Sequence, residues 1–174
     1  NMLEKNKKGL FLLQMEGGMG KTTFVKLLDE CMGKGVSLQD TSVRAYYIND
    51  AYSSSINSFI NKTRFTLQQL PSRKDVSIPR NISLNIMSST DLVNVLDAFR
   101  REYLRRGNEK KEKLLFIIDG IDEILEEEGS SIFDLIPRKE QLKENVYILL
   151  TCRNNEDVSD FVKKKLSLDD VFGK

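Results

Sequence analysis

The sequence predicts an α/β domain in which a mostly parallel sheet is flanked by helices, and three observations support this fold class. Residues 10–13, 114–118 and 146–150 are continuous apolar runs, which is typical of strands buried on both faces. Segments with apolar residues at helical spacing separate these runs. A glycine-rich turn, residues 15–20, joins the first run to a helical segment. The alternation of strands and helices favours a parallel sheet that is covered on both sides.

The remaining elements follow in order along the chain. The predicted helices span residues 22–31, 53–70, 90–104 and 156–166, and a further strand spans residues 43–48. The residues expected on the buried stripe of the first helix are Phe24, Leu27, Leu28 and Cys31. Gly33 and Gly35 are expected to end this helix. Thr90 is expected to cap the third helix.

Two basic regions are expected at the surface. Residues 71–79, which begin and end with proline, predict a long surface loop. The third helix carries four arginines that lie mostly off its apolar stripe: Arg100, Arg101, Arg105 and Arg106. We interpret this cluster as a solvated face, with contact to an acidic partner as the alternative.

The length and charge narrow the function classes. The chain has 174 residues, which suits a single domain over residues 1–174, and its formal net charge is +1. This charge gives no electrostatic reason to expect nucleic acid or an acidic membrane as a partner. No apolar run approaches the ~20 residues that cross a bilayer, and no signal-peptide pattern is found, so we expect a cytoplasmic protein. Asn1 precedes Met2, and we expect the chain to be a piece of a longer protein.

The cysteine and histidine content limits the possible chemistry. There are two cysteines, Cys31 and Cys152, and no histidine, so a zinc site is not expected. We interpret both cysteines as buried thiols. Without imidazole, proton transfer has to use carboxylates, lysine, tyrosine or water.

The strongest motif is a phosphate-binding loop over residues 15–23, MEGGMGKTT. Glycines allow the backbone to curl with positive φ, and the following helix points its first amides at an anion. Lys21 is expected to reach the β- and γ-phosphates, and the Thr22 hydroxyl to bind Mg²⁺. The predicted nucleotide-binding residues are Gly17, Gly18, Met19, Gly20, Lys21, Thr22 and Thr23. The usual pattern is G-x-x-x-x-G-K-[ST], and Met15 stands here where its first glycine is expected.

Carboxylates follow the third predicted strand. Asp119 ends the apolar run 114–118 and is expected to hold Mg²⁺ through water. Asp122 and Glu123 come three and four residues later, and either can orient the attacking water. We prefer Glu123 for that role. The alternative for this pair is ordinary charge on a surface loop.

An arginine follows the fourth predicted strand. In a parallel sheet the carboxyl ends of the strands form the ligand edge, so Arg153 is expected to sense the γ-phosphate. A structural salt bridge is the competing interpretation. The predicted catalytic residues are therefore Lys21, Asp122, Glu123 and Arg153.

These motifs together resemble the NACHT branch of the STAND ATPases. The resemblance rests on residues 17–23, GGMGKTT, and residues 114–123, LLFIIDGIDE, whose doubled acidic ending is the more distinctive element. Residues 151–153, TCR, are similar to the sensor segment of that family. The resemblance extends from about Gly9 to Arg153.

The resemblance implies a three-layer P-loop core of the ASCE type, with an inserted strand between the two strands that bear the Walker motifs. It also implies an ADP-bound resting state, ATP-driven oligomerisation, and a role in signalling or defence. ATP or ADP with Mg²⁺ would be the ligands, and other copies or other domains of the parent protein the partners. We therefore predict slow ATP hydrolysis that operates a conformational switch, and we expect the family's helical and winged-helix segments elsewhere in the longer protein.

Other P-loop classes remain as alternatives. A small-molecule or nucleotide kinase needs arginines in a lid, for which Arg73, Arg80 and the arginines at 100–106 are candidates, but no acceptor site is evident. A partitioning-type ATPase carries lysine where this chain has Glu16, which argues against that class. A nonhydrolysing nucleotide-binding adaptor differs from a slow ATPase only in turnover.

Overall fold

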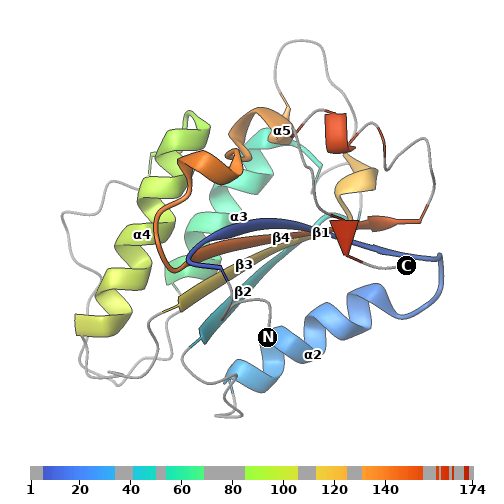
Figure 1. The fold of residues 1–174 in the computed structure, drawn as a ribbon, viewed down its shortest axis with the longest axis horizontal. Helices are drawn as coiled ribbons and strands as arrows, with labels where there is room; N and C mark the ends of the chain where they lie inside the picture. The colour runs from blue at the N-terminus through green and yellow to red at the C-terminus, as the bar shows by residue number, and fades with distance from the viewer. Residues whose placement is uncertain are drawn as a thin grey trace.

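A parallel β-sheet forms the centre of the computed structural model (Figure 1), which describes residues 6–33, 41–49, 54–68, 85–105, 113–124, 131–154, 160, 162–164, 166 and 171–172. The strands are β1 (Gly9–Met15), β2 (Thr41–Tyr47), β3 (Lys113–Asp119), β4 (Val146–Arg153) and the short β5 (Val171–Phe172). Their order in the sheet is β2-β3-β4-β1-β5, and every pairing is parallel. The predicted parallel sheet is confirmed. The inserted strand is also present, because β4 lies between β1 and β3.

Helices cover both faces of the sheet and complete a three-layer α/β fold (Figure 1). Helix α2 (Lys21–Gly33) lies on one face, and α3 (Ile56–Gln68), α4 (Ser89–Arg105) and the short α5 (Ile132–Leu135) lie on the other. Two 3-10 helices lie between β3 and β4 in the chain. The first, η1 (Ile121–Glu123), comes directly after β3, and the second, η2 (Lys139–Gln141), comes before β4. The sequence did not predict α5, η2 or β5, because each is too short to show a periodicity.

Alternate residues of the strands pack into two separate hydrophobic cores, one on each face of the sheet. In β3, Leu114, Phe116 and Ile118 belong to the larger core, which α3, α4 and α5 cover. Leu115 and Ile117 point the other way, into the smaller core beneath α2. Both faces of the sheet are thus apolar, which explains why the strand sequences are continuous apolar runs.

The buried stripe of α2 differs from the predicted one. Phe24 and Leu27 are exposed, at 44% and 55%, whereas Val25 is fully buried. Leu28 does pack against the smaller core, as predicted. The inward face of the helix also includes the partly buried Lys21, four residues before Val25. The rotation of α2 therefore brings Lys21 to the sheet rather than burying the most apolar side chains.

The ends of two helices also differ from the prediction. The Ser88 hydroxyl accepts a hydrogen bond from the backbone N–H of Asp91 at 3.2 Å, and it donates to the Asp91 carboxylate at 2.8 Å. Ser88 is therefore the residue that caps α4, and Thr90 lies inside the helix. Gly33 is the last residue of α2 rather than the residue after it.

The arginine cluster of α4 is partly paired within its own helix. The Nη2 atoms of Arg100 and Arg101 each lie 2.9 Å from a carboxylate oxygen of Asp97. The predicted residues and segments that lie outside the described part are Gly35, the loop at 71–79, Arg73, Arg80 and Arg106, together with the side chains of Cys31 and Arg105. The final predicted helix is described at residues 160, 162–164 and 166, which are helical. Within the described residues, no helix combines the length and the apolar character that a bilayer crossing requires.

Candidate phosphate-binding site

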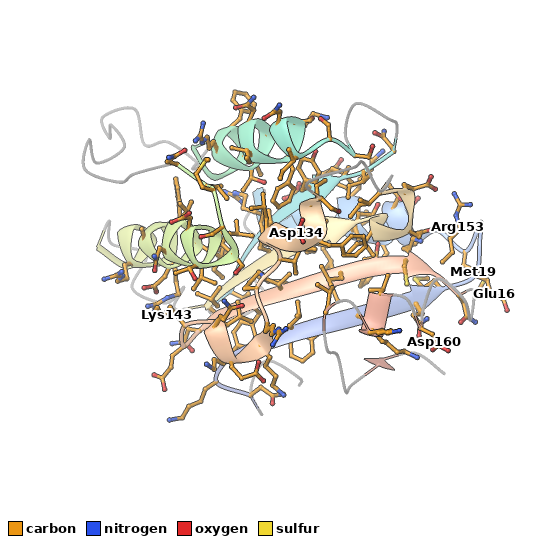
Figure 2. The ribbon with its side chains drawn as sticks, turned by 90° about the horizontal axis from the view of Figure 1, so that it is seen from above. Glu16, Met19, Asp134, Lys143, Arg153 and Asp160 are labelled. Atoms are coloured by element: carbon orange, nitrogen blue, oxygen red, sulfur yellow. The ribbon has the colours of Figure 1, made fainter. Side chains whose placement is uncertain are left out.

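A cleft of about 400 Å³ opens where the carboxyl ends of β1, β2 and β3 and the last residue of β4 meet the start of α2. Its lining residues are Glu16, Gly17, Gly18, Gly20, Lys21, Thr22, Thr23, Ile48, Asn49, Gly120, Asp122, Glu123 and Arg153. Figure 2 shows the labelled Glu16, Met19 and Arg153 gathered at one end of the molecule. Most of the residues selected from the sequence therefore meet in one place, although they come from distant parts of the chain.

The turn after β1 has the shape of an anion cradle. Gly18 and Gly20 adopt positive φ angles of 79° and 80°, a conformation that favours glycine. A Cβ atom built on Gly17 or on Gly18 would meet nothing within 4 Å, so the backbone there faces open space. The Phe24 N–H donates to the Gly20 carbonyl at 2.8 Å, which begins α2 directly behind the turn. Backbone amides in such a turn can converge on a phosphate.

The structure shows where two methionines of the glycine-rich motif, Met15 and Met19, lie. Met15 is the last residue of β1, pairs with Arg153 of β4, and has no positive φ. A glycine is therefore not required at Met15 by the backbone. Met19 lies in the turn, is 64% exposed, and does not line the cleft.

Below the cleft, Asp119 joins the turn to the sheet. Asp119 is only 2% exposed. The Thr22 hydroxyl donates to Asp119 Oδ2 at 2.7 Å, and the Thr151 hydroxyl donates to Asp119 Oδ1 at 2.5 Å. The end of β3 is thus tied to the first turn of α2 on one side and to β4 on the other.

Four charged side chains meet beside the turn. Lys21 Nζ lies 3.8 Å from Asp122 Oδ1, and both side chains are largely buried, at 14% and 5% exposed. Arg153 Nε lies 3.3 Å from Asp122 Oδ2, and Arg153 Nη2 is hydrogen-bonded to Glu123 Oε1. The salt bridge that competed with phosphate sensing in the sequence interpretation of Arg153 is therefore present. Asp122 bridges the two cations, and Glu123 contacts only the more exposed one in these pairs.

Gly120 lets β2 and η1 approach each other closely. Its φ is 81°, and a Cβ atom there would lie 2.5 Å from the carbonyl oxygen of Ile48. The Ile48 N–H donates to the Asp119 carbonyl at 2.9 Å across the same junction. Because η1 begins at Ile121, directly after Gly120, this close approach determines the positions of Asp122 and Glu123.

Cys152 lies behind the ion pairs but takes no part in them. It is fully buried, as the sequence predicted. Burial, reinforced by the nearby Asp122 carboxylate, raises the pKa of the Cys152 thiol to about 11. The thiol is therefore protonated at neutral pH and is a poor nucleophile.

Sequence reasoning missed the part that Thr151 and Ile48 play. Thr151 was noted only as part of the TCR segment, and Ile48 only as the end of a strand. The available signal was position, because Ile48 follows β2 directly and Thr151 lies two residues before the end of β4, and both strands neighbour β3. Without the strand order, that position does not identify a contact with Asp119 or Gly120.

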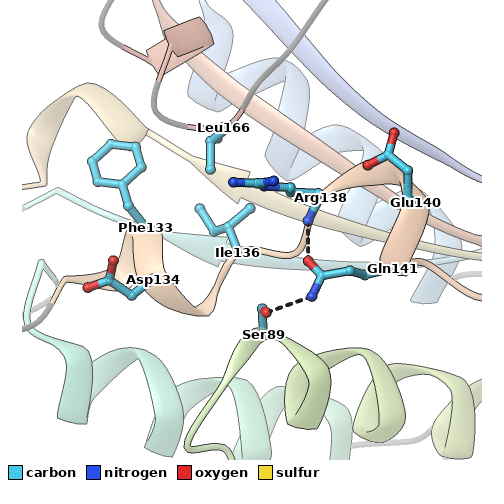
Figure 3. A pocket seen from close by; sticks show the side chains of 8 residues that line it. All are labelled: Ser89, Phe133, Asp134, Ile136, Arg138, Glu140, Gln141 and Leu166. Atoms are coloured by element: carbon cyan, nitrogen blue, oxygen red, sulfur yellow. Dashed lines mark hydrogen bonds between the residues drawn. The ribbon is translucent and has the colours of Figure 1, made fainter.

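A second cleft, of about 560 Å³, has a different character (Figure 3). Its lining residues are Ser89, Phe133, Asp134, Ile136, Arg138, Glu140, Gln141 and Leu166. The Gln141 side-chain amide donates to the Ser89 hydroxyl at 3.2 Å, and its carbonyl accepts from the Arg138 backbone N–H at 2.7 Å. No glycine is among the residues that line this second cleft, so it has no glycine-rich turn to hold a phosphate. The first cleft is therefore the candidate for binding phosphate.

The chain is similar to a protein family and to a solved structure. A family model described as "Nephrocystin 3, N-terminal" matches residues 1–153. Among solved structures, the chain is similar to the ORC2 protein of Aeropyrum pernix, described in ADPNP and ADP complexes, with 18% identity and a TM-score of 0.38. That match covers 92% of this chain and 38% of the ORC2 chain, so this chain spans well under half of that protein's length. None of the curated proteins in the comparison matches this chain.

Proposed function

The chain belongs to the Nephrocystin 3 N-terminal family, an NACHT-associated region with a P-loop NTPase-like fold, and we propose that it binds ATP or ADP with Mg²⁺. The observation that carries this proposal is the hydrogen bond from the Thr22 hydroxyl to the buried Asp119 carboxylate, at 2.7 Å. It joins the glycine-rich turn to the end of β3, which is the pairing that a Mg²⁺–nucleotide site requires.

In this proposal the turn holds the phosphates through its backbone. Gly17, Gly18 and Gly20 leave the amides accessible, and the N-terminus of α2 adds a favourable dipole. Met19 and Thr23 would contribute through their backbone amides. Lys21 lines the cleft and would move from Asp122 to a phosphate oxygen, an exchange of one anionic partner for another.

The residues present fit Mg²⁺ as the metal. Within the described residues, no group of three or more His, Cys, Asp or Glu can hold a metal ion, so a site built from protein ligands alone has no support here. Mg²⁺ typically needs only one or two protein oxygens besides phosphates and water. Thr22 offers a hydroxyl oxygen at the cleft, and Asp119 behind it would act through that hydroxyl or through water. The chemistry that Mg²⁺ supplies in such sites is to bridge β- and γ-phosphate oxygens and neutralise their charge.

For the attacking water, the contacts favour Asp122 over Glu123, which is the reverse of our preference from sequence. Asp122 Oδ1 is buried and accepts no hydrogen bond from any described residue. A buried carboxylate oxygen without a donor favours binding a water molecule. Arg153 pairs with both carboxylates, but the Glu123 side chain is 42% exposed, whereas that of Asp122 is only 5% exposed. We therefore propose that Asp122 orients and polarises the water.

The switch depends on Arg153, whose side chain is 60% exposed and lines the cleft. Without a γ-phosphate, its guanidinium remains on Asp122 and Glu123. A γ-phosphate would compete for the same guanidinium, since arginine binds phosphate and carboxylate with the same geometry. The transfer would free both carboxylates and alter the surface around η1. We propose that this change signals ATP rather than ADP to other copies or to other domains of a longer protein.

Binding can be tested by calorimetric titration of the chain with ADP and ATP, with and without Mg²⁺. Lys21→Ala should weaken nucleotide binding by at least tenfold, because a hydrogen bond to a charged group contributes about 1.5–3 kcal/mol. Lys26→Ala is the matched control, since Lys26 is an exposed lysine of the same helix. Absence of binding by the unaltered chain to any adenine or guanine nucleotide would contradict the proposal. Equal affinities for the two variants would show that Lys21 does not contact phosphate.

A further inference from the structure

The Thr151 hydroxyl lies below the proposed site, where it is hydrogen-bonded to Asp119 and Gly120. Thr151 is fully buried on β4 and lies beside Asp119, because the β3–β4 pairing runs up to Ile118 and Leu150. Its hydroxyl donates to Asp119 Oδ1 at 2.5 Å and accepts from the Gly120 N–H at 3.1 Å. Neither Thr151 nor Asp119 lines the cleft. A contact between them can therefore affect a ligand only through another residue.

The direction of each proton in this network is fixed. A threonine hydroxyl has one hydrogen. The Gly120 N–H occupies a lone pair of Thr151, so the single hydrogen of Thr151 is directed to Asp119. Asp119 Oδ1 is thereby held by β4, which leaves Oδ2 to accept the hydrogen of Thr22.

The consequence falls on Thr22, the only one of these hydroxyl groups at the cleft. With its hydrogen committed to Asp119, the Thr22 oxygen presents only lone pairs to the cleft. Lone pairs of oxygen are what Mg²⁺ requires. If Asp119 turned, Thr22 could direct its hydrogen into the cleft and repel the cation.

We infer that Thr151 is a positioning residue for Mg²⁺: it fixes Asp119, and through Asp119 it keeps the Thr22 oxygen available to the metal. This inference rests on the proposed nucleotide function and deepens it. Removal of a group that orients a metal ligand typically weakens metal binding by about 10–100-fold. The effect should appear in the Mg²⁺ requirement rather than in nucleotide binding as such.

The test uses the whole chain and measures ADP binding over a range of Mg²⁺ concentrations. Thr151→Val keeps the shape and removes the hydroxyl, and it should raise the Mg²⁺ concentration for half-maximal enhancement by about 10–100-fold. ADP binding measured in EDTA should change little. Thr151→Ser restores the hydroxyl and should return the Mg²⁺ requirement to within about twofold of the unaltered chain, as retention of both bonds implies.

Thr63→Val is the matched control. Thr63 is also fully buried, and its hydroxyl has no hydrogen-bond partner among the described residues. This variant makes the same chemical change in α3 and should leave the Mg²⁺ requirement unaltered. If Thr151→Val does not fold, the pair Thr151→Ala and Thr151→Ser provides the comparison, since both lack the methyl group and only the serine has the hydroxyl.

The outcomes separate this inference from the proposed function. An unaltered chain that shows no Mg²⁺-dependent nucleotide binding would contradict the proposed function itself. The role of Thr151 alone would be overturned if the unaltered chain and Thr151→Val showed the same Mg²⁺ dependence. The same conclusion would follow if the alanine and serine variants did not differ.

Discussion

Asp122 lies between two cations, with Lys21 Nζ 3.8 Å from one carboxylate oxygen and Arg153 Nε 3.3 Å from the other. Lys21 belongs to α2 and Arg153 to the end of β4, so one aspartate links elements from opposite ends of the chain. Both cations can also bind phosphate, and Asp122 therefore competes with a nucleotide for them.

Arg153→Ala should abolish discrimination between ATP and ADP while leaving ADP binding within a few-fold. A hydrogen bond from arginine to a γ-phosphate is worth about 1.5–3 kcal/mol, and its loss reduces the preference for ATP about tenfold or more. Titration with ADP and with a nonhydrolysable ATP analogue measures the ratio. Arg138→Ala, an exposed arginine of the second cleft, is the control. Equal weakening for both nucleotides would mean that Arg153 does not distinguish them.

Asp122→Asn should retain nucleotide binding and slow phosphate release by about 10²-fold, the lower range for loss of a general base. Glu123→Gln should have a smaller effect, because the Glu123 side chain is 42% exposed, whereas that of Asp122 is 5% exposed. Turnover by the unaltered chain should itself lie well below the ~10 per second of a median enzyme, so single-turnover conditions are needed. A larger loss in Glu123→Gln than in Asp122→Asn would reverse the assignment.

Gly120→Ala should destabilise the fold, whereas Gly17→Ala should not. Alanine at Gly120 would carry a φ of 81° and bring its Cβ to 2.5 Å from the Ile48 carbonyl oxygen. A left-handed conformation alone costs a non-glycine residue about 1–3 kcal/mol. Gly17 has no positive φ and open space at its Cβ position. Urea unfolding compares the two variants, and equal midpoints would show that the junction with Ile48 can relax.

Asp29→Asn should stabilise the protein at neutral pH. Burial raises the pKa of Asp29 above its usual 3.8, even though Arg44 and the Tyr47 hydroxyl oppose the shift. The folded protein thus binds this proton more tightly than the unfolded chain does. Its stabilising effect is present below pH 3.8 and is lost as the pH rises through the raised pKa.

Asparagine avoids the partly buried charge and can still accept the hydrogen bond that Tyr47 donates to Asp29 at 3.4 Å. The melting temperature should therefore rise at pH 7, and the gain should shrink as the pH falls toward 3.8. Asp160→Asn, at a side chain that is 79% exposed, is the control. A gain that is the same at both pH values would show that charge burial is not its cause.

The strands could be predicted because a strand that is buried on both faces has a continuous run of apolar residues in the sequence. The run at 114–118 is apolar throughout since its residues enter two cores in turn, and the glycine-rich turn with Asp119 indicated the site. The rotation of α2 could not be predicted in the same way. Hydrophobicity favoured Phe24 and Leu27 inside, but Val25 is the buried residue, and Thr22 is hydrogen-bonded to Asp119.

Contacts between residues of neighbouring strands could not be predicted from local sequence patterns. Periodicity places residues on a face but does not order the strands, so Thr151 could not be assigned to Asp119. The choice between Asp122 and Glu123 depends on which carboxylate is buried, and that depends on how η1 lies against the end of the sheet. The salt bridges of Arg153 were foreseen only as an alternative.

The central position of β4 has a consequence for synthesis of the chain. Strand β1 pairs only with β4 and β5 among the described strands, and Gly9 finds its partner in Tyr147. A growing polypeptide on the ribosome therefore carries β1 unpaired until residues 146–153 have emerged. Pairings between such distant segments fold slowly and leave sheet edges exposed meanwhile. A premature stop before residue 146 would thus remove the partner of β1 along with Thr151 and Arg153, and would release an aggregation-prone fragment in place of a shortened domain.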